Sequence, residues 1–242
     1  MQNKLHLLGR IASLFCVLAL MNLHAETAMP DTPTPTVIEL FTSQGCNSCP
    51  PAEALLGEYA SNPNVLLLAF HVDYWDYLGW RDPFALPVSK QRQRGYVQSL
   101  QLSSAFTPQS IVNGQLSMVG SDRRRLQSAL GEKVHGIHVM LAKSNNTLTI
   151  TLPEAASKTA FDVQLITYQQ EASTPVPHGE NAGNTLKEHN VVRSFQTLPR
   201  WNGQATRLNE SLTNIPSGAN RVAVIVQQIN QGAIVGAASL AL

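Results

Sequence analysis

The chain of 242 residues has almost no excess of charge and few cysteines. Lysine and arginine number 17 and aspartate and glutamate 16, for a formal net charge of +1. A nucleic-acid-binding protein needs a clustered basic field, which this balance does not supply. Three cysteines are too few for a disulfide scaffold or a closed zinc site. What remains is a folded protein, because 43% of the residues are apolar and a disordered chain has fewer.

The first 25 residues are typical of an export signal. Lys4 and Arg10 precede the apolar run 11–20, and Ala25 places a small residue at a cleavage position. The alternative is a membrane anchor, but the run is shorter than the roughly 20 residues that cross a bilayer. We therefore expect cleavage after Ala25, which also removes Cys16. The mature chain is expected to be periplasmic or secreted and to have no membrane span.

Regular patterns begin after a Pro/Thr-rich tether over residues 26–36. Strand and helix signals then alternate up to residue 133, and Val65–Val72 is an apolar run of the kind that is buried on both faces of a sheet. The expected elements are strand 37–41, helix 51–59, strand 65–72, helix 89–100, a hairpin over 110–119 with its turn at Asn113-Gly114, and a helix that Ser121-Asp122 caps and that ends near residue 130. This order predicts an α/β thioredoxin-like domain.

Strand signals dominate the rest of the chain. Expected strands cover 137–142, 148–152, 161–169, 190–195, 221–228 and 233–240. Short strands separated by turns favour a β-rich, sandwich-like region, and the short link 131–136 favours its packing on the first domain. The predicted organisation is therefore a signal peptide (1–25), a tether (26–36), a thioredoxin-like domain (37–133) and a β-rich region packed on it (134–242).

The motif Cys46-Asn-Ser-Cys49 carries the clearest chemistry. It holds both cysteines of the expected mature chain and precedes Pro50-Pro51 and a predicted helix. Two sulfurs at this spacing can meet at a helix N-terminus, where backbone N–H groups and the helix dipole favour a thiolate. We expect Cys46 to attack a substrate and Cys49 to resolve the mixed disulfide, with no cofactor beyond this redox-active pair. A static disulfide and half of a metal site are the alternatives, although further soft ligands for a metal are lacking.

Two other positions can complete such a site. Thr107-Pro108 directly precedes the predicted hairpin, and a proline at this place in thioredoxin-like proteins is cis and faces the CxxC motif. The alternative is an ordinary turn proline. Glu39 lies on the strand before the motif and is either a buried proton acceptor for Cys49 or an outward-facing residue.

Aromatic residues gather between residues 70 and 84, which hold six of the fifteen Phe, Tyr and Trp residues. A wall of rings beside the motif would bind an extended peptide through Tyr74, Trp75 and Trp80. The alternative is a hydrophobic cluster that closes the edge of the sheet. His71 in this segment is expected to be a core residue, and the loop 178–184 is either a lid or a hairpin connection.

Several long motifs resemble one known family. They are Val37-Ile-Glu-Leu-Phe-Thr-Ser-Gln-Gly-Cys46-Asn-Ser-Cys49-Pro-Pro, Phe70-His-Val-Asp-Tyr-Trp-Asp-Tyr-Leu-Gly-Trp80-Arg-Asp-Pro, the run from Tyr96 through Thr107-Pro-Gln, Val119-Gly-Ser-Asp122, Gly179-Glu-Asn-Ala-Gly and Asn190-Val-Val-Arg193. Together they resemble the secreted bacterial thioredoxin-like family catalogued as domain of unknown function 1223. The resemblance implies a thioredoxin-like fold and export, but no established reaction.

Three functions are compatible with these patterns. The first is an exported thiol–disulfide oxidoreductase that acts on protein or small-molecule thiols and disulfides. The second is a non-catalytic binding module with a static Cys46–Cys49 disulfide. The third is a thiol peroxidase, which would need a Thr or Ser and an Arg around Cys46 that the sequence does not identify. The patterns specify neither the redox direction nor the oligomeric state.

Overall fold

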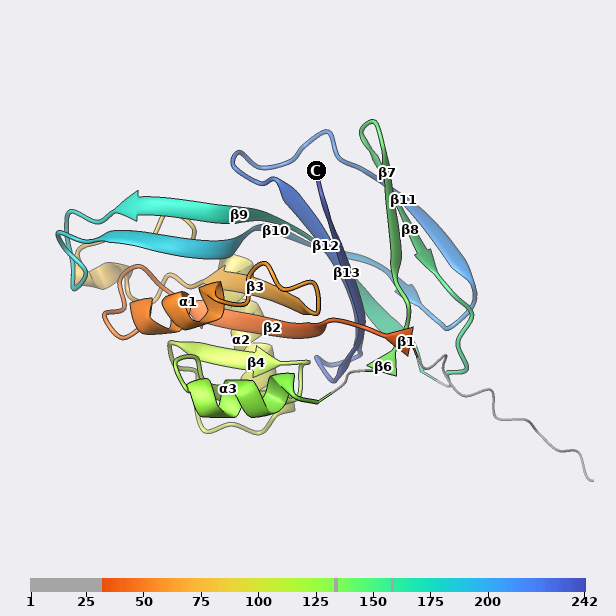
Figure 1. Cartoon of the computed structure of the whole chain (residues 1–242), viewed down its shortest axis with the longest axis horizontal. Helices are drawn as coiled ribbons and strands as arrows, with labels where there is room; N and C mark the ends of the chain where they lie inside the picture. The colour runs from red at the N-terminus through yellow and green to blue at the C-terminus, as the bar shows by residue number, and fades with distance from the viewer. Residues whose placement is uncertain (1–31, 133–134, 158) are drawn as a thin grey trace, which may run out of the picture.

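The structure, a computed structural model, describes residues 32–132, 135–157 and 159–242. The predicted signal peptide and residues 26–31 of the tether lie outside these ranges. The main element is an eight-stranded mixed sheet that draws strands from both halves of the chain (Figure 1). From edge to edge its strands are β13 (Ile234–Ala241), β12 (Arg221–Gln228), β9 (Phe161–Pro175), β10 (Thr185–Trp201), β3 (Val65–His71), β2 (Thr36–Thr42), β4 (Gln109–Val112) and β5 (Leu116–Val119).

The fold class predicted from the sequence is wrong. Instead of an α/β thioredoxin-like domain followed by a β-rich, sandwich-like region, the described residues are mostly β-sheet, with three α-helices of 8, 13 and 8 residues. The large sheet continues past β3, because β10 lies parallel to it with Val191 opposite Ala69. The apolar run of β3 is buried throughout, as predicted. The order of elements predicted the local units but not the distant strand that pairs with β3, since neighbours in sequence are only often neighbours in a sheet.

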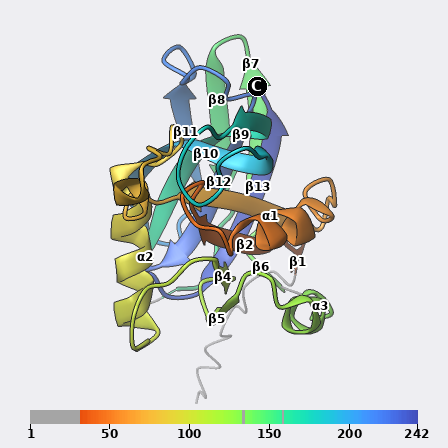
Figure 2. The ribbon, with the colours of Figure 1, turned by 90° about the vertical axis from the view of Figure 1, so that its left-hand side faces the viewer.

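Two helices cover opposite faces of the sheet at β2 and β3, namely α1 (Pro50–Gly57) and α2 (Pro87–Ser99) (Figure 2). Side chains alternate along β2, so Ile38 and Leu40 pack against α1 whereas Phe41 packs against α2. Each face of the sheet therefore has its own apolar core and its own buried polar groups. In the part of the chain that the structure describes, no helix has the length and apolar character to cross a membrane.

A smaller sheet packs on the end of the large one that is farther from the helices (Figure 1). Its strands, in spatial order, are β11 (Thr206–Ser211), β8 (Thr147–Leu152) and β7 (Met140–Ser144). Apolar side chains of the two sheets, such as Ile150 and Val224, share one core. A short antiparallel pair, β1 (Thr32–Pro33) with β6 (His135–Gly136), joins the end of the predicted tether to the start of the second half.

Local predictions with a specific turn or cap are confirmed. The hairpin of β4 and β5 turns at Asn113 and Gly114, whose φ angles are 50° and 70°. Asparagine and glycine adopt this left-handed backbone at low cost. The helix α3 (Arg123–Leu130) begins after Asp122, whose carboxylate accepts the N–H of Arg125 at 3.1 Å.

Candidate active site

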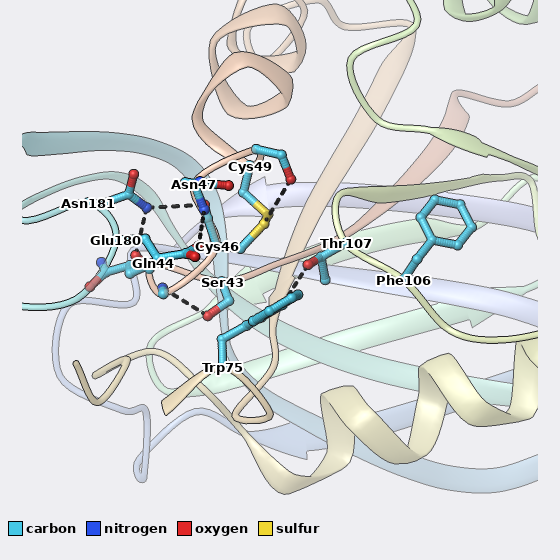
Figure 3. Close-up of a disulfide and its surroundings, with 12 residues drawn as sticks. Ser43, Gln44, Cys46, Asn47, Cys49, Trp75, Phe106, Thr107, Glu180 and Asn181 are labelled. Carbon is cyan, nitrogen blue, oxygen red and sulfur yellow. Dashed lines mark hydrogen bonds between the residues drawn. A yellow bond between two sulfur atoms is a disulfide. The ribbon is translucent and has the colours of Figure 1, made fainter. Parts of the chain in front are cut away.

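A disulfide joins Cys46 and Cys49 where β2 leads into α1 (Figure 3). Cys49 is the N-cap residue of the helix, and Pro50 and Pro51 occupy its first two positions. Because proline has no N–H, this first turn offers fewer backbone donors to a thiolate than a helix that begins without proline. The Ser48 hydroxyl lies 3.3 Å from Cys46 Sγ and is the donor, since a disulfide sulfur carries no hydrogen.

Both cysteines are buried in this oxidised form, with 2% and 1% of their surface exposed. Part of the cover is the connection between β9 and β10 (Figure 3). Asn181 Nδ2 donates to the carbonyl of Gln44 at 2.9 Å and to that of Cys46 at 3.1 Å. Glu180 accepts the N–H of Asn47 at 3.3 Å. The loop that the sequence left open as a lid or a connection is thus a connection that also lies on the motif.

Thr107 lies on the other side of the motif from Asn181 (Figure 3), and Pro108 follows it in the chain. The peptide bond between them is cis, as predicted. The Trp75 indole donates to the Thr107 hydroxyl at 2.8 Å. A Cβ atom on Gly45 would lie 2.9 Å from Trp75 Cβ, so glycine lets the aromatic segment approach the backbone before the motif.

The predicted aromatic residues line one side of the site and also pack on the core. Trp80 Nε1 donates to Gln44 at 3.0 Å, and the Tyr74 hydroxyl donates to Gln93 at 3.3 Å. Tyr74 and Trp75 pack against the apolar cluster of the α2 face. Tyr77 is 76% exposed and stacks on Trp75 with ring centroids 6.4 Å apart. Contact of these rings with a substrate stays a prediction.

Glu39 does not face the cysteines, because it lies on the α2 face of β2. Arg92 Nη2 donates to its carboxylate at 2.9 Å, and the Tyr96 hydroxyl donates to it as well. Arg92 Nη2 also donates to Gln227 at 3.0 Å. Burial would lower the pKa of Arg92, but Glu39 raises it above its usual range. We call these four residues the α2-face cluster; its carboxylate is fully partnered, so a role as proton acceptor for Cys49 has no support in the geometry.

Gln44 connects the groups on the α1 face. Its backbone N–H donates to Asp82 at 2.8 Å, and its Nε2 donates to both carboxylate oxygens of Glu188 at 3.0 Å. Its Oε1 accepts the indole N–H of Trp80. One buried side chain thus ties the loop before the disulfide to the aromatic segment and to β10.

His71 and Asp82 form a buried ion pair behind this loop, with Nδ1 2.8 Å from Oδ2. Burial would lower the pKa of His71, but Asp82, Glu188 and Glu53 together raise it to about 9. Burial would raise the pKa of Asp82, but His71 holds it below its usual value. The pair is therefore an imidazolium and a carboxylate at neutral pH.

Glu53 is the least satisfied carboxylate of the site. It lies one helical turn after Cys49, is 6% exposed, and neither of its oxygens has a hydrogen-bond partner. Burial raises its pKa to about 7, although the positive charge of His71 and the nearby Thr42 hydroxyl oppose the rise. Glu53 completes what we call the α1-face cluster, which consists of Gln44, Glu53, His71, Asp82 and Glu188. Across the described ranges, no three His, Cys, Asp or Glu residues are grouped so as to hold a metal ion.

A cavity of about 370 Å³ lies between α1 and the start of β10. Cys49 and Glu53 line it from the helix and Glu188 lines it from the strand. Its volume is within the roughly 300–1,000 Å³ of small-molecule sites. Cys49 of the disulfide and the carboxylate of Glu53 therefore border one cavity.

The sequence alone indicates no functional role for the residues of the α1-face cluster. The position of Glu53 beside Cys49 could have been predicted, because a residue four positions after Cys49 on a predicted helix lies on the same side of that helix. The contact of Gln44 with Glu188 could not, since 144 residues separate them in the chain. His71 was expected to be a satisfied core residue; it is buried, but its Nε2 has no hydrogen bond.

The fold and the site define a mixed β-sheet protein with a CxxC disulfide beside a buried charged cluster. The chain belongs to the family described as "Protein of unknown function (DUF1223)", whose model matches residues 37–227. This confirms the family that the sequence motifs indicated. No curated protein matches the chain.

Similar solved structures include those of the following two proteins. The first is a crystal structure of the protein AGR_C_4864 from Agrobacterium tumefaciens, with 29% identity, a TM-score of 0.75 and coverage of 86% of this chain and 95% of that chain. The second is HBP35 of Porphyromonas gingivalis, with 15% identity, a TM-score of 0.58 and coverage of 87% and 76%. At that identity the second likeness concerns the fold alone. Neither name states a reaction, so function has to be argued from the site.

Proposed function

We propose that the chain is an exported thiol–disulfide oxidoreductase that works through Cys46 and Cys49. The observation that carries the proposal is the position of the disulfide, which borders a cavity and an array of buried charged groups. A disulfide with a purely structural role needs neither, and unpartnered charged groups are costly to bury. Such groups are typical of sites where they act on a ligand or a reaction.

The reaction is a pair of exchanges. In the reduced protein the Cys46 thiolate attacks one sulfur of a substrate disulfide, which forms a mixed disulfide and releases one substrate thiolate. The Cys49 thiolate then attacks Cys46 Sγ, which restores the protein disulfide and releases the second substrate thiolate. Two electrons pass from the protein to the substrate, and the two protons of the protein thiols end on the two substrate thiols. The reverse sequence oxidises two thiols.

The surroundings of the motif support these roles. Asn47 and Ser48 are exposed between the two cysteines, so a substrate can reach the motif from this side. The Ser48 hydroxyl is placed to donate to a Cys46 thiolate. The N-terminal signal pattern at Lys4 and Arg10 supports export, and exported proteins meet conditions in which paired thiols oxidise.

One observation favours the second function, a binding module with a static disulfide. Both cysteines are almost fully buried, and Asn181 anchors the covering loop to the carbonyl of Cys46. A static bridge of this kind would resist reduction under conditions that reduce an exposed disulfide.

Trapping of mixed disulfides separates the two functions. Cys49→Ser leaves Cys46 able to attack but removes the residue that releases the adduct, so mixed disulfides are expected to accumulate in the compartment to which the protein is exported. The matched control, Cys46→Ser, is expected to trap none. A non-reducing gel measures both, and the reduction potential of the mature protein gives the redox direction. Equal adducts in both variants, or none in either, favour the binding module.

A further inference from the structure

The cavity beside Cys49 is lined by a buried carboxylate, Glu53, to which no protein group makes a hydrogen bond of normal geometry, although the Thr42 hydroxyl lies near it. Glu53 projects from α1 into its wall with both oxygens unpartnered. Leaving such a group unpaired costs about 1–3 kcal/mol. A ligand that donates hydrogen bonds to Glu53 would remove this cost.

The charges around Glu53 favour a cation as that ligand. Three carboxylates, those of Glu53, Asp82 and Glu188, face a single buried cation, His71, whose ring nitrogens lie 2.8 Å from Asp82 and 3.8 Å from Glu188. From β10, Lys187 and His189 also line the cavity; Lys187 is exposed, and the His189 ring packs against Gly57 of α1. Neither of them makes a hydrogen bond or an ion pair with Glu53, whose oxygens have no partner.

The rest of the wall is apolar. Pro50 and Ala54 of α1 and Leu186 of β10 line it together with Cys49. A short alkyl chain fits such a lining, and a protonated amine at its end brings three N–H donors to a carboxylate. Sulfur carried on the same alkyl chain would lie at Cys49, the cysteine of the disulfide that lines the cavity and that is bonded to Cys46.

We propose that this cavity binds small thiols or disulfides that carry a protonated amine, with the ammonium group on Glu53 and the sulfur at the Cys46–Cys49 pair. The part of the proposal that makes these molecules substrates rests on the oxidoreductase function proposed above. The contact between the ammonium group and Glu53 does not rest on it. In the reaction the amine stays protonated, and the exchanges at sulfur are the two described above.

The first experiment measures binding without any redox chemistry. The oxidised protein is titrated by calorimetry with hexamethylenediamine, in which methylene groups replace the two sulfurs of cystamine, and with the uncharged diol of the same length. The diamine is expected to bind at least about tenfold more tightly than the diol, because a charged hydrogen bond is stronger than a neutral one. Glu53→Gln is expected to abolish this difference, whereas the control Glu58→Gln, an exposed residue at the end of α1, is expected to retain it.

A second variant keeps the test valid if Glu53→Gln perturbs folding. Ala54 is exposed at the cavity, so Ala54→Lys adds a competing ammonium group without changing the core. This variant is expected to lose binding of the diamine. Equal binding of diamine and diol by the wild-type protein, or tight diamine binding by both Glu53→Gln and Ala54→Lys, overturns the proposal.

The second experiment measures reaction. The reduced protein is mixed with cystamine or with hydroxyethyl disulfide, and each rate is divided by that of a free cysteine peptide. Cystamine is expected to be favoured at least about tenfold, and Glu53→Gln to lower this ratio towards one. If the diamine binds through Glu53 but no disulfide reacts, the oxidoreductase function fails and the cation site stands. If both disulfides react equally and the diamine does not bind, the function stands and this inference fails.

Discussion

Two clusters of buried charge lie on opposite faces of the central sheet, and they differ in how completely their members are partnered. In the α2-face cluster, Arg92 and Tyr96 donate to the carboxylate of Glu39, and Gln227 hydrogen-bonds both of them. In the α1-face cluster, Glu53 has no hydrogen-bond partner and borders a cavity with Cys49. A closed network has no capacity left for a ligand, whereas an open one does. We therefore expect the α2-face cluster to stabilise the fold and the α1-face cluster to serve function.

The largest expected loss of stability comes from a change in the α2-face cluster. Arg92→Met leaves Glu39 as an unpaired buried carboxylate, which is expected to lower the free energy of unfolding by about 3–5 kcal/mol. Urea denaturation at neutral pH measures the loss. The control is Arg123→Met, which removes an exposed ion pair with Glu58 and is expected to change stability little. A loss no larger than that of the control would contradict the structural role of this cluster.

Asp82→Asn tests the ion pair within the open cluster. His71 keeps its charge through Asp82, so the variant is expected to lose about 2–4 kcal/mol at neutral pH, less than a fully isolated charge because Glu188 and Glu53 remain. The pKa of His71 is raised in the folded state, so its contribution is complete below the ordinary value of 6.5 and is lost as the pH rises through about 9. Denaturation between these pH values should show this loss in the wild-type protein and a smaller one in the variant. Identical pH profiles would show that Asp82 does not set the charge of His71.

Glu53→Gln is expected to act in the opposite direction, as a stabilising change. Burial raises the pKa of Glu53 from 4.5 to about 7, so ionising this carboxyl disfavours the folded state as the pH rises from 4.5 through 7. At pH 8, glutamine should therefore raise the free energy of unfolding by about 1–3 kcal/mol, and the gain should disappear near pH 4.5. Glu39→Gln is the matched control and should destabilise at pH 8. If both glutamines destabilise, the contrast between the clusters fails.

The smallest expected effect is on the rate at which the disulfide is reduced. It concerns the connection between β9 and β10, which lies on the CxxC motif on the side of the α1-face cluster. Asn181→Ala removes two hydrogen bonds, to the carbonyls of Gln44 and Cys46, and is expected to weaken the cover by about 1 kcal/mol. The disulfide should then be reduced a few-fold faster by a small thiol, as followed by alkylation and mass spectrometry. Asn184→Ala, an exposed position of the same loop, is the control. An unchanged rate would mean that Asn181 does not limit access.

Sequence patterns predicted the parts of this site that depend on local chemistry. The CxxC motif at a helix start, the cis bond before Pro108 and the cap at Asp122 all follow from residues close together in the chain. The pairing of β10 with β3 does not follow from nearby residues, because it depends on which distant strand pairs with the apolar strand β3. The side of the sheet on which Glu39 lies also had to come from the structure. Side chains alternate along a strand, but over so short a strand the alternation does not tell which residues face the cysteines.

The bond between Gln44 and Glu188 has a consequence for the order of events during synthesis. The ribosome makes the chain from its N-terminus at about 5–20 residues per second, so the 144 residues between these partners take on the order of ten seconds. For that interval Cys46 and Cys49 exist without the segment that covers them. The newly made thiols therefore stay uncovered until the C-terminal strands arrive and close the site.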